Sequence, residues 1–182
     1  MSSDATDLRD RAAELLITPA ALAQLSAADA AKVVNYMRPR WFPAGHVVME
    51  EGDAKDSDLM LLVIDGELSV ESHQMAIDED WVVRLMGPGS LIGEMSLLDG
   101  APRSASCVAH TDLVAAELRR HEFQRLIQEQ PDVGARLLWA IATRLSVHLR
   151  DATRRLKLLT TMNRALSRSL ATDDDPANDD AT

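Results

Sequence analysis

The sequence predicts an α+β fold, in which a small antiparallel β-barrel or jelly roll lies between N-terminal helices and a long C-terminal helix. Three observations predict it. Apolar residues recur at helical spacing in residues 8–37. Short runs rich in Val, Leu and Ile, broken by Gly and Asp about every ten residues, follow in residues 46–117. Helical spacing then returns after Arg119.

These observations divide the chain into four segments. We expect N-terminal helices at 1–40, the β-barrel at 41–118, C-terminal helices at 119–171 and a disordered acidic tail at 172–182. Pro19 separates two short helices in the first segment, Ser26 is the expected N-cap of the second, with Asp29 in its first turn, and Pro39 closes the segment.

Six strands are expected in the second segment. They are His46–Met49, Leu59–Ile64, Glu67–Glu71, Trp81–Met86, Ala105–Ala109 and Leu113–Glu117. Asp65-Gly66 stands between two apolar runs and is the strongest hairpin signal in the chain. Trp41, Trp81 and Trp139 are interpreted as core anchors.

The third segment predicts a helix at His121–Gln130, ended by Pro131, and a long helix from about Asp132 to Ser169. Leu138, Leu145, Ala152, Leu159 and Leu166 recur every seventh residue along it. The companion positions three residues on include His148 and Arg155 and form a weaker apolar stripe. This pattern favours a homodimer through the long helix over a single helix lying on the barrel.

Composition limits the classes of function. The chain has 182 residues, 46% of them hydrophobic, and a single cysteine, Cys107, so it has room for one domain and cannot form an internal disulfide. Cys107 has apolar neighbours, which favours a buried structural thiol. No apolar run is long enough for a signal peptide or a membrane span, and we expect a cytoplasmic protein with no membrane contact. No histidine or cysteine spacing predicts a metal site.

The net charge of −10 argues against a general affinity for nucleic acid. Eight basic residues and one acid, Asp151, lie between Arg136 and Arg168. This basic stripe is more commonly a solvated helix face than a nucleic-acid contact. Nucleic acid is therefore not an expected partner.

The segment from Gly87 to Ala105 carries the candidate chemistry. Its glycines do not have the spacing of a dinucleotide-binding or phosphate loop. A cyclic phosphate ester would need a guanidinium that donates two parallel hydrogen bonds, a short helix that presents free amides, and a carboxylate for the ribose 2′-hydroxyl. A helix beginning just after Gly93-Glu94 would supply the amides, and Glu94 is placed for the ribose.

The run Ile92-Gly93-Glu94-Met95-Ser96-Leu97 followed by Pro102-Arg103-Ser104-Ala105 resembles the phosphate-binding cassette of cyclic nucleotide-binding domains. The resemblance extends to Phe42-Pro43-Ala44-Gly45, to Glu51-Gly52-Asp53 and to Gly66-Glu67, and covers roughly Leu25 to Leu156. It implies that Glu94 accepts from the ribose 2′-hydroxyl and that Arg103 pairs with the cyclic phosphate. It also implies that the Ser104 hydroxyl contacts the phosphate and that the backbone at Gly93, Met95 and Ser96 lines the same pocket.

The sequence departs from the family's pattern at two places. Ile92 replaces the usual phenylalanine. Where bacterial cAMP-dependent regulators of this family have a Thr-Ser pair that reaches the base, this chain has His148 and Leu149. His148 can still hydrogen-bond a purine edge, whereas Leu149 cannot, so this departure leaves the base open. The resemblance as a whole implies cAMP as the ligand, with cGMP or another cyclic nucleotide as alternatives.

Three functions are weighed. The leading one is a stand-alone signalling module, without a DNA-binding domain, that rearranges its helices on binding and acts through an effector protein. The second is a degenerate fold that serves as a protein-interaction scaffold or binds a different nucleotide. The third is an enzyme such as a phosphodiesterase, which would need a metal cluster or a nucleophile with its base, and the sequence predicts neither; no cofactor is expected.

Overall fold

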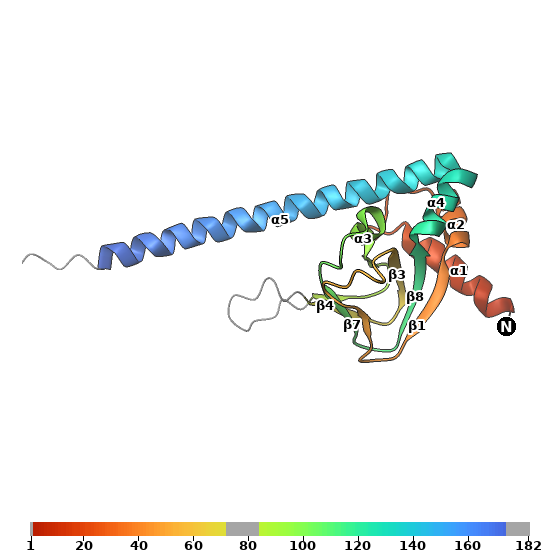
Figure 1. Ribbon diagram of the computed structural model, residues 1–182, viewed down its shortest axis with the longest axis horizontal. Helices are drawn as coiled ribbons and strands as arrows, with labels where there is room; N and C mark the ends of the chain where they lie inside the picture. Colours follow the sequence, from red (N-terminus) through yellow and green to blue (C-terminus); the bar gives the residue numbers. More distant parts are fainter. Residues whose placement is uncertain (1, 72–83, 174–182) are drawn as a thin grey trace, which may run out of the picture. The chain divides into compact units, whose positions relative to one another are not determined.

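The computed structural model describes residues 2–71 and 84–173 (Figure 1). The chain divides into two compact units, residues 1–144 and residues 145–182. The first unit contains the described strands, the helices that accompany them and the first turns of the long helix α5. In the second unit the described residues continue α5, which spans Pro131–Asp173. No described helix has the combination of length and hydropathy that crossing a bilayer requires.

The described strands form two four-stranded sheets, and every pairing between neighbours is antiparallel. The first sheet has the order β1 (Arg38–Phe42), β8 (Leu113–Arg119), β3 (Leu59–Asp65) and β6 (Leu91–Ile92). The second has the order β2 (Val47–Met49), β7 (Ser106–Ala109), β4 (Leu68–Glu71) and β5 (Arg84–Met86). The fold is therefore a two-sheet arrangement of the jelly-roll kind, and the predicted fold class is confirmed without a closed barrel among these strands.

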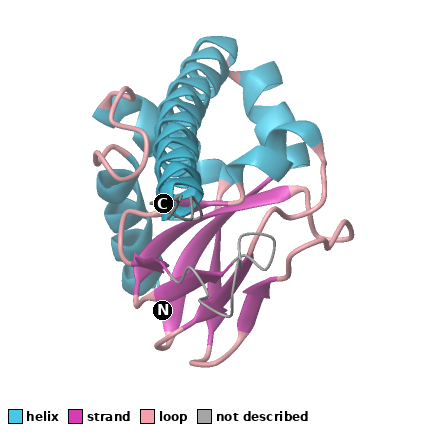
Figure 2. Cartoon of the chain, turned by 90° about the vertical axis from the view of Figure 1, so that its left-hand side faces the viewer, coloured by secondary structure: helices cyan, strands magenta, loops and turns pink. Residues whose placement is uncertain are grey.

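One hydrophobic core forms between the two sheets. Alternate residues of β3 and β8 point into it, among them Leu61, Val63 and Ala115, and β4 and β7 contribute Leu68 and Cys107. Cys107 is 4% exposed, so the sequence correctly predicts a buried thiol. Figure 2 shows the described strands of the first unit in magenta and the loops that connect them in pink.

The hairpin predicted at Asp65-Gly66 is wrong, because β3 and β4 belong to different sheets. The turn instead carries the chain from one sheet to the other and is held by the β7–β8 connection, where the Glu67 carbonyl accepts from the amide of His110 at 2.8 Å. Gly66 has a φ of +83°, and a Cβ there would stand 2.2 Å from the Asp112 carbonyl oxygen. The glycine is thus required by close approach of two loops, which a local turn signal does not distinguish from a hairpin.

Two strands were not predicted. β1 contains Pro39, which was expected to close the helical segment; its missing N–H is tolerated because β1 lies at the edge of its sheet. β6 has only two residues, Leu91 and Ile92, and both are buried against β3. The strand predicted at Trp81–Met86 is observed as Arg84–Met86, and residues 81–83 lie outside the described residues.

The helices follow the sequence closely. α1 spans Ser2–Leu16 and α2 spans Ala27–Val33, followed by the short 3-10 turn Val34–Tyr36. Ser26 caps α2 as predicted, accepting from the Asp29 amide at 3.1 Å. α4 spans Arg120–Glu129, and α5 begins at Pro131, a favoured first position for proline. The tail predicted from residue 172 lies outside the described residues, except that α5 includes Thr172 and Asp173.

The first turns of α5 contact α2 through an ion pair. Leu137, Ala140 and Ile141 are fully buried, and Arg136 donates to both carboxylate oxygens of Asp29, at 2.9 and 2.7 Å. Trp139 points away from this packed face and is 72% exposed. The interpretation of the tryptophans as core anchors is therefore wrong for Trp139, and also for Trp41, which is 63% exposed on the edge strand; Trp81 lies outside the described residues.

Candidate functional site

The cassette, defined here as residues 92–105, is built around a short helix. β6 leads into Gly93, and helix α3 then spans Glu94–Asp99, as expected, and ends at Gly100. Both flanking glycines are left-handed, with φ of +78° at Gly93 and +73° at Gly100. A Cβ at Gly93 would stand 2.6 Å from Nη1 of Arg103 and 2.9 Å from the Leu59 carbonyl oxygen. The sequence needs glycine there because Arg103 passes directly over its backbone.

Arg103 is 5% exposed, and its guanidinium is held by main-chain carbonyls. Nη1 donates to the oxygen of Leu59 at 2.9 Å and, more weakly, to that of Gly93 at 3.4 Å. Nη2 donates to the oxygen of Asp56. Burial lowers the pKa of Arg103, while the field of nearby acidic side chains opposes this shift. A buried cation whose hydrogen-bond acceptors are neutral carbonyls is suited to receive an anion.

The main chain of Arg103 is also fixed. Its N–H donates to the carbonyl of Asp53 at 3.0 Å, and its carbonyl accepts from the N–H of Gly52 at 2.9 Å. This reciprocal pair joins the cassette to the Glu51-Gly52-Asp53 motif, which the sequence marked without showing its role. The turn at Gly52, whose φ is +81°, therefore sets the position of Arg103.

Glu94, the first residue of α3, is 7% exposed and faces α5. Its Oε1 lies 3.6 Å from Nε of Arg144, and the side chain of Arg144 is only 11% exposed. The other nitrogens of Arg144 donate to the Leu91 oxygen at 3.1 Å and to the oxygens of Ala20 and Ala21. Nε itself has no hydrogen-bond partner among the described residues. Arg144 thus joins α5 to the cassette and to the segment after α1.

Sequence reasoning does not single out Arg144, which is one of the eight basic residues between Arg136 and Arg168. A signal for it was present. Leu137, Ala140 and Ile141 form the buried face of α5, and Arg144 continues that face at a spacing of three to four residues. A cation on a buried helical face requires a carboxylate or carbonyl partner, and Glu94 is that carboxylate.

The remaining predicted residues lie as follows. Ser96 is buried on α3, whereas Met95 is 51% exposed and Ser104 is exposed. His148 belongs to the second unit, where it is exposed on α5. The first unit therefore brings together Gly93, Glu94, Ser96 and Arg103, while the role of His148 stays a prediction.

A cavity of about 280 Å³ opens beside Arg103. Apolar side chains of Phe42, Met49 and Leu59 form part of its wall, and Arg40, Glu117 and Arg119 form a polar side. Glu94 does not line it. Arg103 thus borders an existing hollow.

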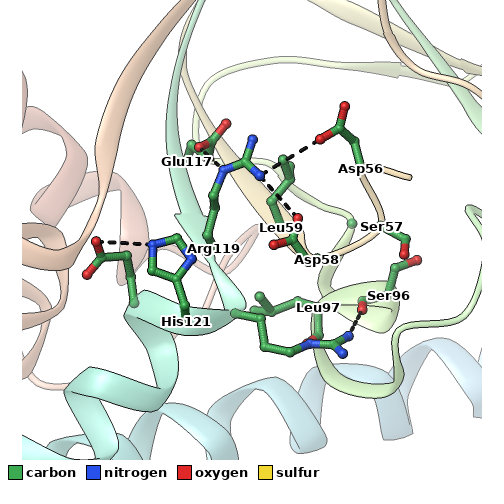
Figure 3. A network of polar contacts seen from close by, with 12 residues as sticks. Asp56, Ser57, Asp58, Leu59, Ser96, Leu97, Glu117, Arg119 and His121 are labelled. Atoms are coloured by element: carbon green, nitrogen blue, oxygen red, sulfur yellow. Dashed lines mark hydrogen bonds and ion pairs between the residues drawn. The ribbon is translucent and has the colours of Figure 1, made fainter. Parts of the chain in front are cut away.

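The polar side of this cavity is an ion-pair network at the end of β8 (Figure 3). Glu117 is 5% exposed and accepts from Arg40 at 2.6 Å and from Nε of Arg119 at 2.8 Å. Nη1 of Arg119 lies 3.2 Å from Asp58 and 3.8 Å from Asp56. The network therefore connects β1 and β8 to the loop whose carbonyls hold Arg103. Among the described residues no group of histidine, cysteine and carboxylate side chains has the arrangement of a metal site.

Comparison with known proteins agrees with this geometry. The sequence profile of the family described as "Cyclic nucleotide-binding domain" matches residues 39–130. The "Cyclic AMP receptor protein" of Thermus thermophilus is 34% identical over 126 residues, which are 69% of this chain and 55% of that protein. The "CRP-like cAMP-activated global transcriptional regulator" of Mycobacterium tuberculosis is 28% identical over 115 residues, which are 63% of this chain and 50% of that protein.

A solved structure is similar over most of the chain. The crystal structure of a cyclic nucleotide-binding domain from Methylobacillus flagellatus superposes with a TM-score of 0.68 at 27% identity and covers 82% of each chain. The chain spans about half the length of the two curated relatives named above. The likeness is therefore to one part of those regulators.

Proposed function

Because this chain belongs to the cyclic nucleotide-binding domain family, we propose that it binds cAMP, with cGMP as the alternative, between Glu94 and Arg103 and transmits that event to a partner protein without catalysing a reaction. One observation carries the proposal. Arg103 is a buried cation whose guanidinium donates to the carbonyls of Leu59, Gly93 and Asp56. A cyclic phosphate offers the same donors a charged acceptor, and charge-assisted hydrogen bonds are about twice as strong as neutral ones.

Glu94 supports the proposal from the other side. It is buried at the first position of α3, and its Oε1 lies 3.6 Å from Nε of Arg144. A ribose hydroxyl is a donor of the right kind for such a carboxylate. A ligand that engages both residues would use its phosphate on Arg103 and its sugar on Glu94.

The signal is proposed to leave the site through Arg144. A hydroxyl that donates to Glu94 changes the field at the Arg144 guanidinium, which also holds Leu91, Ala20 and Ala21. The ligand therefore changes the relative stability of the contacts that hold the start of α5. We propose that α5 presents the result to an effector protein and that it pairs with a second copy along Leu138, Leu145, Ala152 and Leu159. Leu138 and Leu159 are 43% and 63% exposed.

Calorimetric titration with cAMP and with cGMP tests the proposal. The wild-type protein is expected to bind one nucleotide per chain, and Arg103→Ala is expected to lose that binding. Arg11→Ala is the matched control, because Arg11 is half exposed on α1 and pairs only weakly with Glu14, at 3.6 Å. It removes the same charge and should bind like the wild type.

The alternative function is a scaffold that has kept the fold and binds no mononucleotide. The same titration separates the two. If neither nucleotide gives a saturable heat or a thermal shift, the scaffold function is favoured. If the wild type and Arg103→Ala bind equally, the ligand site is not the one proposed here.

A further inference from the structure

Arg120 stands where β8 ends and α4 begins. Its side chain reaches α3: Nε donates to the Leu97 oxygen at 2.9 Å, and Nη2 donates to the Ser96 oxygen at 2.6 Å. These carbonyls belong to the last turn of α3, where a cation adds donors to the helix end and opposes the negative end of the helix dipole. Arg120 therefore fixes the far end of the helix whose first residue is Glu94.

The main chain of Arg120 contacts the loop that holds Arg103. Its N–H donates to the Asp58 carbonyl at 2.7 Å. The same loop supplies the carbonyls of Asp56 and Leu59 that hold the guanidinium of Arg103. Arg120 is thus bonded, by its side chain, to the helix that carries Glu94. By its backbone, it is bonded to the loop that holds Arg103.

The fit around the guanidinium is close. A Cβ at Gly100 would stand 2.8 Å from Nη1 and 3.0 Å from Nη2 of Arg120. The turn that ends α3 therefore lies directly against this side chain. A six-residue helix has few internal hydrogen bonds of its own, so its orientation depends on such external contacts.

We infer that Arg120 is a positioning residue for the nucleotide site, which sets the distance between Glu94 and Arg103 and, as the first residue of α4, links both to that helix. The inference rests on the proposed function. If nucleotide binding shifts α3 or the loop at Asp58, the hydrogen bonds of Arg120 pass that shift to the start of α4.

Arg120→Met, which keeps the length of the side chain and removes its donors, is expected to weaken cAMP binding by about tenfold, the effect of losing a charge-assisted hydrogen bond. Arg120→Lys keeps a cation that can reach the same carbonyls and is expected to recover part of the affinity. Arg125→Met is the matched control in α4, because Arg125 is half exposed and pairs with Glu122 and Glu129 rather than with α3. It should bind like the wild type.

Amide hydrogen exchange separates positioning from a general loss of stability. In Arg120→Met the amides of residues 95–99 are expected to exchange faster, because the variant loses only the side-chain bonds to α3, while the central strands β3 and β8 keep their protection. A purely structural role would instead raise exchange throughout the protected core. If Arg120→Met does not fold, the nucleotide affinity and amide exchange of Arg120→Lys are compared with those of the wild type instead.

The outcomes distinguish this inference from the function on which it rests. If the wild type binds neither cAMP nor cGMP, the proposed function fails and the inference fails with it. If the wild type binds and Arg120→Met binds with equal affinity and unchanged exchange in α3, only the role of Arg120 is overturned. Weaker binding in Arg120→Met, partly recovered by lysine and absent in Arg125→Met, is the expected result.

Discussion

Nε of Arg144 lies 3.6 Å from Oε1 of Glu94, and both side chains are about nine-tenths buried. Arg144 comes from α5 and Glu94 from the first position of α3, so this pair joins the long helix to the cassette. The pair is close enough for a strong electrostatic attraction but too long for a hydrogen bond.

Removal of Arg144 is expected to be costly. Arg144→Ala would remove the cation beside the buried Glu94 carboxylate and the donor to the Ala20, Ala21 and Leu91 oxygens, so the free energy of unfolding should fall by about 3–5 kcal/mol. Urea denaturation of the variant and the wild type measures this change in the free energy of unfolding. Arg154→Ala is the control, since Arg154 makes an exposed pair with Asp151 at 3.5 Å and should cost less than about 1 kcal/mol. Equal effects of the two variants would contradict the buried link.

Gly93→Ala is expected to destabilise the chain and abolish nucleotide binding. Its φ is +78°, and the new Cβ would meet Nη1 of Arg103 at 2.6 Å and the Leu59 oxygen at 2.9 Å. Gly45→Ala separates the two causes, because Gly45 has a φ of +80° and nothing within 4 Å of its Cβ position. That variant should cost about 1–2 kcal/mol and bind normally. Normal binding by Gly93→Ala would show that Arg103 can move without loss of function.

Stability should decrease at acidic pH through the Asp29–Arg136 pair. The hydrogen bond from Arg136 lowers the pKa of Asp29 from 3.8 to about 2. Because the folded-state pKa is the lower one, the contribution is complete above about pH 4 and is lost as the pH falls toward 2. Arg136 is half exposed, so solvent screening makes this contribution small. The difference in unfolding free energy between wild type and Asp29→Asn should shrink over this range; a difference independent of pH would contradict the assignment.

Cys107 should be unreactive in the folded protein. Burial raises the pKa of its thiol to about 12, so almost no thiolate forms at pH 8. A thiol reagent such as iodoacetamide is therefore expected to modify Cys107 only after denaturation, which mass spectrometry can follow. Stoichiometric labelling of the native protein within minutes would show that the core around β7 opens readily.

The proposed pairing of α5 is tested by Leu159→Glu in analytical ultracentrifugation. Leu159 is 63% exposed and lies on the heptad stripe, where a charge in a helix–helix seam should shift a dimer toward monomer. Thr160→Glu adds the same charge one position away from the stripe and should leave the mass unchanged. A monomeric wild type would refute the dimer.

Much of the fold is predictable because its signals are local. The N-cap at Ser26, the length of α5 and the short helix after Gly93 follow from residues next to one another in the chain. β1 and β6 were missed because their evidence is not local. Pro39 fits a strand only at a sheet edge, and β6 is too short to show alternation. The turn at Gly66 is set by contact with Asp112, which is distant in sequence.

The site shows the same division. The cassette motif identifies Glu94 and Arg103, because its residues are contiguous. The partners of those residues come from elsewhere: Arg144 from α5, and Arg120 from the β8–α4 junction. A motif gives the residues proposed to meet the ligand, whereas the residues that hold them in place emerge only when the chain is folded.

The structure of the protein with cAMP bound tests the central claim most directly. Arg103 is predicted to leave the carbonyls of Asp56 and Leu59 and to donate to the cyclic phosphate, while Glu94 accepts from the ribose 2′-hydroxyl. A nucleotide bound elsewhere, with Arg103 still on those carbonyls, would contradict the account.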